Sequence, residues 1–102
     1  MKKILIITYK LDPWFDYIPF YGRLKEICGN GHYMHITENS WLVYTEKTPA
    51  ELVNELRPLM AKPHDRIAYD SIFIAGITKE HEGYVGKSVW EWLKKQENEE
   101  NQ

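Results

Sequence analysis

The chain has 102 residues, a formal net charge of −2 and a hydrophobic content of 43%. This length suits one domain with a single core, and this hydrophobic content excludes a disordered chain. No apolar run is long enough to span a membrane, and no signal peptide precedes the first apolar strand, so we expect a cytoplasmic protein. The single cysteine, Cys28, excludes an intrachain disulfide and a thiolate metal cluster, and we interpret it as a small core residue.

The first strand is predicted from a run of four apolar residues, Ile4-Leu5-Ile6-Ile7. Such a run is too short for a helix and too apolar for an exposed strand, which indicates a central strand covered on both faces. A loop with charges, a proline and aromatic residues follows at residues 10–16. Small α/β domains often place their chemistry in such a loop, because a rigid strand delivers it to a defined point.

The first helix is predicted to follow a cap at Asp16, with Pro19 in its first turn, where the missing N–H costs nothing. Apolar residues at helical spacing give it one inward face: Phe20, Leu24, Ile27 and Cys28. Gly29-Asn30-Gly31 ends the helix, because these residues accept positive φ angles.

Two short strands, at residues 32–36 and 40–45, are rich in residues that favour a pleated surface, and the polar gap between them predicts a hairpin. A second helix begins at Thr48-Pro49-Ala50-Glu51, where threonine and glutamate form a capping box around a first-turn proline. Pro58 is expected to kink or shorten this helix.

The last long strand is expected within residues 65–76, and a polar loop at residues 78–87. Ser88 then caps a short helix over residues 89–95. Residues 96–102 contain no apolar side chain and three glutamates, so we predict a disordered acidic tail after a single domain at residues 1–95.

The order strand, helix, strand, strand, helix, strand predicts an α+β fold of the ferredoxin-like βαββαβ kind. Such a fold has a four-stranded antiparallel sheet with two helices on one face, here followed by the short C-terminal helix. Because the first strand is apolar on both faces, we expect the second face to be covered by the C-terminal helix, a second copy of the chain, or both. We expect a homodimer.

Several short segments, in order and at suitable spacing, resemble the SinR-like proteins, which are related to the small CRISPR adaptation subunit. They are Ile6-Ile7-Thr8-Tyr9-Lys10-Leu11, Ser40-Trp41-Leu42-Val43, Leu56-Arg57-Pro58 and Glu91-Trp92-Leu93. The resemblance runs from about Lys3 to Lys94. It implies a ferredoxin-like fold, a dimer built through sheets, and kinship with small metal-dependent ribonucleases and toxin-like VapD proteins.

The chain departs from the resembling family at the end of its first strand. That superfamily usually has a Tyr-Asp-Leu pattern there, and the aspartates of a dimer hold a divalent cation; this chain has Tyr9-Lys10-Leu11. A charged lysine offers no lone pair, and two facing lysines repel Mg²⁺. Asp12 is the weak candidate for a replacement ligand. We therefore lean against an enzyme and expect no cofactor, with Mg²⁺ or Mn²⁺ needed only if the chain is a ribonuclease.

The candidate ligand-binding residues are Lys10, Trp14, Tyr17, Arg23 and His81. A lysine beside aromatic rings can bind phosphate while the rings stack on bases, although aromatic residues more commonly pack a loop onto the core. Arg23 can extend a basic patch, and His81 lies in a polar loop. Asp70 interrupts an apolar strand, where a carboxylate must face solvent, pair with a cation or line a site; solvent at the sheet edge is the simplest expectation.

His32 and His35 are three residues apart in a strand, which places them on opposite faces and argues against a shared metal site. We expect no metal site elsewhere in the chain.

Three functions remain open from these residues. The first is a non-catalytic homodimeric binding protein for nucleic acid or a linear or cyclic nucleotide, in bacterial defence, counter-defence or a mobile element. The second is a metal-dependent endoribonuclease that uses Asp12. The third is a protein–protein interaction module or inhibitor.

Overall fold

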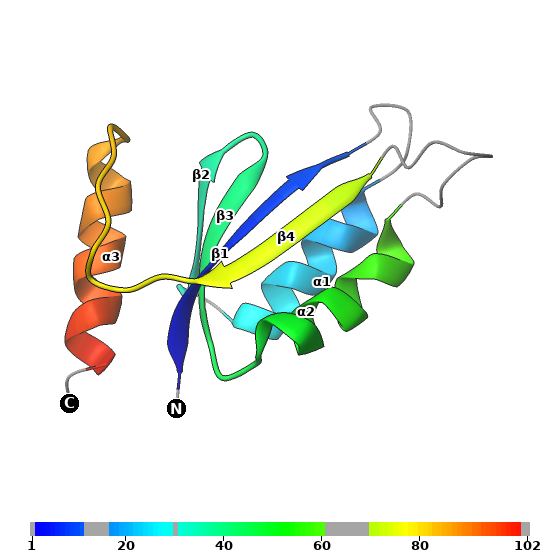
Figure 1. Cartoon of the computed structure of the whole chain (residues 1–102), viewed down its shortest axis with the longest axis horizontal. Coiled ribbons are helices and arrows are strands. Elements are labelled where there is room, and N and C mark those ends of the chain that lie inside the picture. The colour runs from blue at the N-terminus through cyan, green and yellow to red at the C-terminus, as the bar shows by residue number, and fades with distance from the viewer. Residues whose placement is uncertain (1, 12–16, 30, 61–69, 101–102) are drawn as a thin grey trace.

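The computed structural model describes residues 2–11, 17–29, 31–60 and 70–100 (Figure 1). Asp12, Trp14 and the predicted cap Asp16 lie outside the described residues, as do residues 65–69 of the segment that was predicted to contain the last strand. The elements are β1 (Lys3–Lys10), α1 (Ile18–Cys28), β2 (Tyr33–Thr37), β3 (Ser40–Thr45), α2 (Pro49–Leu56), β4 (Ser71–Gly76) and α3 (Lys87–Glu100).

Over the described residues the fold is α+β, with four antiparallel strands in one open sheet and three α-helices, as the sequence predicts at this level. The strand order is β2-β3-β1-β4, so β1 has a neighbour on each side. Ile7 of β1 lies opposite Trp41 of β3 and opposite Ile74 of β4. This central position explains why the first strand is apolar on both faces.

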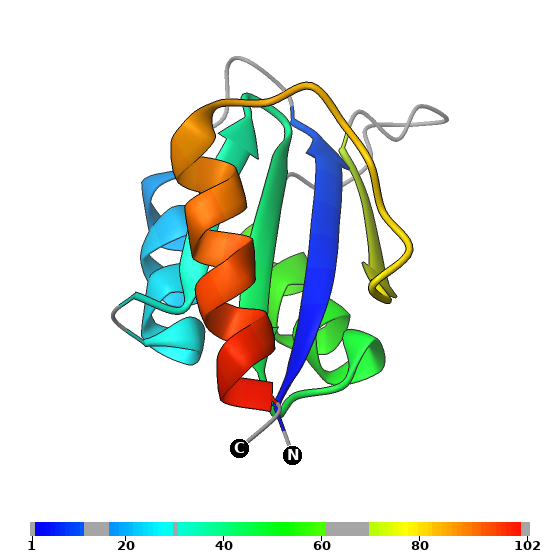
Figure 2. The same cartoon turned by 90° about the vertical axis from the view of Figure 1, so that its left-hand side faces the viewer.

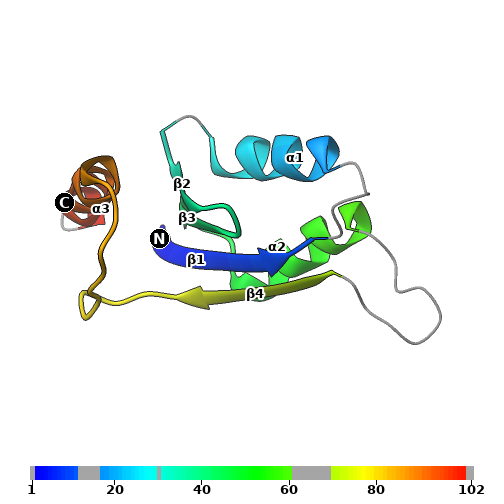
Figure 3. The ribbon, with the colours of Figure 1, turned by 90° about the horizontal axis from the view of Figure 1, so that it is seen from above.

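The main core lies between one face of the sheet and the helices α1 and α2 (Figure 3). Every second residue of β1 contributes to it, as period-two alternation requires: Leu5, Ile7 and Tyr9. The helices add their inward stripes: Phe20 and Leu24 from α1, and Leu52 and Leu56 from α2. The predicted inward face of α1 is confirmed.

A second, smaller core lies between the opposite face of the sheet and α3, which stands in front of that face in Figure 2. Ile4, Leu42 and Tyr44 come from the sheet, and Val89, Trp92 and Leu93 from the helix; all six are buried. The C-terminal helix is thus one of the covers that the sequence predicts for this face. It leaves part of the face uncovered, because Phe73 of β4 is 67% exposed.

The capping box of α2 is confirmed: Thr48 Oγ1 accepts a hydrogen bond of 3.2 Å from the backbone N–H of Glu51, and Glu51 Oε1 accepts one of 3.2 Å from the backbone N–H of Thr48. The predicted shortening at Pro58 is also confirmed. The α-helix ends at Leu56, and Pro58 lies in a 3₁₀ turn at Arg57–Leu59.

Three boundaries differ from the prediction. Helix α1 begins at Ile18, with Tyr17 at its N-cap. Helix α3 begins at Lys87, which places Ser88 inside the helix instead of at its cap, and it continues to Glu100. The predicted disordered tail is therefore wrong for residues 96–100. The physical reason is Gln96, whose fully buried side chain donates from Nε2 to the carbonyl oxygen of Gly31 at 3.4 Å.

Candidate functional site

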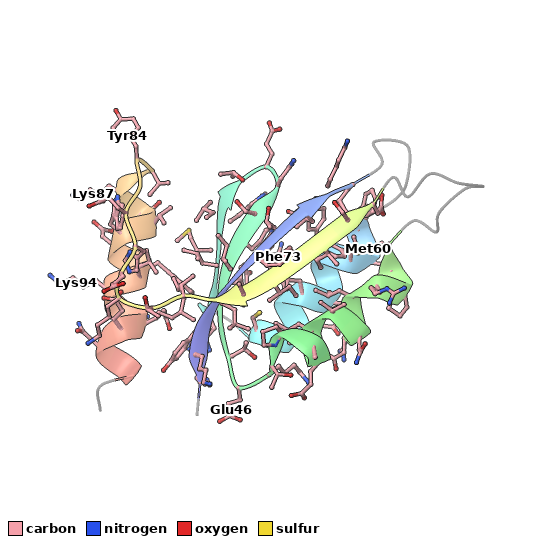
Figure 4. The ribbon with its side chains drawn as sticks, viewed as in Figure 1. Glu46, Met60, Phe73, Tyr84, Lys87 and Lys94 are labelled. Carbon is pink, nitrogen blue, oxygen red and sulfur yellow. The ribbon has the colours of Figure 1, made fainter. Side chains whose placement is uncertain are left out.

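The uncovered part of the second sheet face carries four exposed side chains, which we call the open patch: Thr8, Lys10, Ser71 and Phe73. Thr8 and Lys10 come from β1, where they lie directly opposite Phe73 and Ser71 of β4, respectively. Figure 4 labels Phe73 in the middle of β4, away from Lys87 and Lys94 of α3. The patch is thus built on two rigid, paired strands.

The pattern of β1 explains why the patch is polar at one end. The second-face residues of β1 change along the strand from Ile4 and Ile6 to Thr8 and Lys10. The isoleucines contact the α3 cluster, and the threonine and lysine lie beyond it. The helix therefore covers the apolar half of the strand and leaves the half that water solvates well.

Lys10 and Phe73 form a diagonal pair across β1 and β4. Diagonal neighbours have Cα atoms about 7–8 Å apart, within reach of long and aromatic side chains. An ammonium group binds phosphate as a point charge, and an exposed ring offers a face on which a base can stack. Hydroxyl groups of Thr8 and Ser71 add hydrogen-bonding capacity beside them.

Tyr17 lies in the main core and not on the open patch. Its ring is 9% exposed and packs edge-on against Phe20 at a centroid distance of 6.4 Å. Its hydroxyl donates to the carboxylate of Asp70, with 2.7 Å to each oxygen. The expectation that Asp70 simply faces solvent is therefore wrong, since the carboxylate fixes the start of β4 to the start of α1.

Arg23 lies on the helical side of the sheet, where acidic side chains pair with it. Its guanidinium is 3.2 Å from Glu26 and 3.4 Å from Glu55, and Glu55 also pairs with Lys47 at 3.3 Å. Such partly exposed pairs contribute little stability. They do compensate the positive charge, and Arg23 does not extend the surface around Lys10.

His81 fastens the segment before α3 to that helix. Its Nε2 lies 2.9 Å from Glu97 Oε1, and its ring stacks on Trp90 at 6.1 Å. His81 is therefore held by α3 and stands apart from the open patch.

The two histidines near β2 lie on opposite faces, as predicted. His32 contacts Tyr44, with ring centroids 5.6 Å apart, and His35 stacks on Trp41 at 4.9 Å. Trp41 and Tyr44 belong to the two different cores. Within residues 2–11, 17–29, 31–60 and 70–100, no three histidine, cysteine or acidic side chains gather as a metal site would require.

A hollow of about 460 Å³ lies at the other end of the sheet, near the start of β1. Its lining consists of Lys2, Ile27, Cys28, Tyr44, Thr45, Glu46, Lys47 and Glu51. Two lysines and two glutamates oppose each other there, so the hollow favours neither sign of ligand charge. Burial raises the pKa of the Cys28 thiol to about 12, which makes it an inert core group, as expected from the sequence.

Sequence reasoning missed Phe73 as a site residue. The signal was present in Ser71–Gly76, where Ile72 and Ile74 occupy alternate positions. Because alternate residues share a face, Phe73 must point away from the core that holds the two isoleucines. Lys10 was predicted, and the register of β1 and β4 is what brings it beside Phe73.

Comparison of the chain with protein-family models, with curated proteins and with solved structures finds no match. The described helices are too short or too polar to cross a lipid bilayer. The resemblance to SinR-like proteins stays a prediction.

Proposed function

We propose that this chain is a non-catalytic binding protein for nucleic acid or a nucleotide, that it works as a homodimer, and that the open patch contacts the ligand. The observation that carries the proposal is the exposed pair of Lys10 and Phe73 on adjacent strands. A role in bacterial defence, counter-defence or a mobile element belongs to the same proposal. It rests on the resemblance to SinR-like proteins.

We extend the proposal to a ferredoxin-like fold. Its support is the order β2-β3-β1-β4, antiparallel throughout, with α1 and α2 packed in one core. In such a fold one sheet face is available for ligands when no helix covers it. Sheets of this form often present aromatic residues on that face, on which unpaired bases stack.

The charge at the patch favours binding over metal-dependent cleavage. Lys10 stands where the resembling family carries its metal-binding aspartate, and Lys10 is exposed at the end of β1. A cation at this position attracts phosphate oxygens and repels Mg²⁺. The overall charge of −2 argues that the contact is local, with few phosphates neutralised.

Fluorescence anisotropy with labelled single-stranded RNA, single-stranded DNA, and linear and cyclic nucleotides tests the proposal. We expect Phe73→Ala to weaken binding by about 1–3 kcal/mol for one stacked base. We expect Lys10→Glu to weaken it further at low salt, because attraction to phosphate becomes repulsion. The matched control is Lys94→Glu, an exposed charge reversal on α3.

Equal affinity of Lys10→Glu and the wild type for every ligand would refute the proposed site. The melting curve of Lys10→Glu should match that of the wild type, because Lys10 is exposed. RNA cleavage that requires Mg²⁺ or Mn²⁺ and disappears in Asp12→Asn would support the ribonuclease instead.

A further inference from the structure

The outer edge of β4 presents unpaired backbone groups in the described structure. Strand β4 is the last strand of the order β2-β3-β1-β4, so no described strand pairs with its outer side. Directly after β4, the N–H of Ile77 donates to the carbonyl of Ile4 at 3.1 Å. Because hydrogen-bonded pairs alternate with non-bonded pairs along an antiparallel ladder, the odd-numbered residues of β4 form the backbone bonds to β1. Ile72, Ile74 and Gly76 therefore direct their N–H and C=O groups outward.

In the part of the chain that the structure describes, this edge lacks the features that normally keep strands from pairing with other chains. Ser71–Gly76 contains no charged residue and no proline, and its pairing with β1 is regular. Proteins protect exposed edges with charges, prolines, bulges or covering segments. The opposite edge has one of these, because β2 shows a register irregularity between His35 and Thr37. Among the described residues, the β4 edge carries no such feature and can accept a partner strand.

We infer that a second copy of this chain pairs with β4 in antiparallel fashion about a twofold axis at Phe73. In an antiparallel pair, two directly opposed residues point to the same face of the sheet, so their numbers are both odd or both even. The twofold axis therefore lies at a residue that opposes its own copy, and not between two residues. An axis at Phe73 sets Ile72 opposite the partner's Ile74 and Ile74 opposite the partner's Ile72, with their outward backbone groups bonded. It also sets Phe73 opposite the partner's Phe73.

The exposure of Phe73 selects this axis over one at Ile74. Phe73 is the only strand residue among the large apolar side chains that are strongly exposed in the described chain. In the pairing centred on it, the two rings occupy a position without backbone hydrogen bonds, where opposed side chains come closest. Aromatic pairs across strands stabilise a sheet. An axis at Ile74 would leave each ring opposite Ala75.

The pairing joins the two open patches, since an axis perpendicular to the sheet keeps the same face of both copies on one side. Three strand spacings of about 4.8 Å and four residue rises of about 3.4 Å place the Cα atoms of Lys10 and the partner's Lys10 roughly 20 Å apart. The two Phe73 rings lie between them. This step rests on the proposed function: the ligand is then a single-stranded oligonucleotide that spans both copies, and a mononucleotide would contact only one half.

Sedimentation velocity of two charge variants tests the pairing without any ligand. In Phe73→Glu and in Phe73→Lys, like charges face each other at the axis, and we expect self-association to weaken at least tenfold. An equimolar mixture of the two variants should associate again, because opposite charges then meet. The matched control is the pair Tyr84→Glu and Tyr84→Lys, at an exposed residue of the segment before α3 (Figure 4). These should sediment as the wild type does, alone and mixed.

A wild-type chain that remains monomeric at about 100 μM would overturn the inference, because a stable dimer forms at concentrations well below that value. The inference would also be overturned if Phe73→Glu and Phe73→Lys each associated as strongly as the wild type, or if their equimolar mixture did not associate. Lys10→Glu separates the two proposals: we expect it to dimerise normally and to lose oligonucleotide binding. If the wild type dimerises through Phe73 but binds no oligonucleotide, the proposed function fails and the pairing stands.

Discussion

Trp41 Nε1 donates a hydrogen bond of 2.8 Å to the hydroxyl of Tyr9, which ties β3 to β1 inside the main core. Tyr9 is 5% exposed and Trp41 is 3% exposed, so water does not replace this bond. Burial, with the neighbouring Tyr21 hydroxyl, raises the pKa of Tyr9 above its ordinary value. Tyr21 also stacks on Trp41, with ring centroids 6.0 Å apart. The aromatic residues between α1 and the sheet thus form one connected group.

Replacing Tyr9 with phenylalanine should lower stability. The variant keeps the ring but leaves the buried N–H of Trp41 without its partner, which costs about 1–3 kcal/mol. For a domain of this size, each kcal/mol lowers the melting temperature by about 4–8 °C. Urea denaturation followed by tryptophan fluorescence measures the change, and Tyr84→Phe, at an exposed residue, is the control. A Tyr9→Phe midpoint equal to that of the wild type would contradict the role of this bond.

Glu51 should make stability depend on pH at the acidic end. Hydrogen bonds from the backbone and the side chain of Thr48 hold the pKa of Glu51 below its ordinary value. A group whose folded pKa is lowered stabilises the fold above its unfolded pKa and loses that contribution as the pH falls through the folded value. The difference in stability between the wild type and Glu51→Gln should therefore be present at pH 7 and shrink below about pH 4. Denaturation midpoints at several pH values measure it, and a constant difference would be evidence against the capping bond.

The Cys28 thiol should react only when the chain unfolds. Burial raises its pKa to about 12, so almost no thiolate exists in the folded chain at pH 8. Iodoacetamide should label Cys28 at least tenfold more slowly in the folded protein than in 6 M guanidinium chloride, with mass spectrometry as the measurement. Because the folded pKa lies above the unfolded one, the thiol stabilises the fold below the unfolded pKa, and this contribution is lost as the pH rises toward the folded value. Rapid labelling of the folded chain would show that the thiol is accessible.

Trp92→Phe should loosen α3 without unfolding the sheet. The indole N–H of Trp92 donates to the carbonyl oxygen of Gly31 at 2.8 Å, and the phenyl ring cannot replace this bond. A lost hydrogen bond of this kind costs about 0.5–1.5 kcal/mol, which should speed amide exchange in α3 by up to tenfold. Amide hydrogen exchange measured by NMR tests this, with faster exchange expected in α3 and unchanged exchange in β1. Trp90→Phe is the matched control, since Trp90 stacks on His81 and is only partly buried. Equal amide exchange rates of α3 in Trp92→Phe and Trp90→Phe would show that the hydrogen bond from Trp92 to Gly31 does not hold the helix.

The elements that sequence reasoning predicts well are those with local causes. The capping box at Thr48 and Glu51 involves residues three apart, and the hairpin of β2 and β3 needs only two short strands and a polar turn. The inward residues of α1 follow from helical spacing, and the central place of β1 follows from its apolar run. In each case the information lies within a few residues of the element.

The parts that escaped prediction depend on contacts between distant segments. Gln96 looks like part of a polar tail, and only the carbonyl of Gly31 shows why α3 continues through it. Asp70 looks like a solvated edge residue, and only Tyr17 shows otherwise. The open patch is of this kind too, because the register between β1 and β4 cannot be read from Lys10 or Phe73 alone.

The central place of β1 has a consequence for how the chain folds during synthesis. This strand is made before its neighbours β3 and β4, and β4 follows both α1 and α2. Most of the sheet therefore depends on contacts between residues far apart in the chain, which slows folding. Until Gly76 is made, this apolar strand lacks one neighbour, and an unpaired apolar strand edge is the kind of surface that makes incompletely folded chains prone to aggregate.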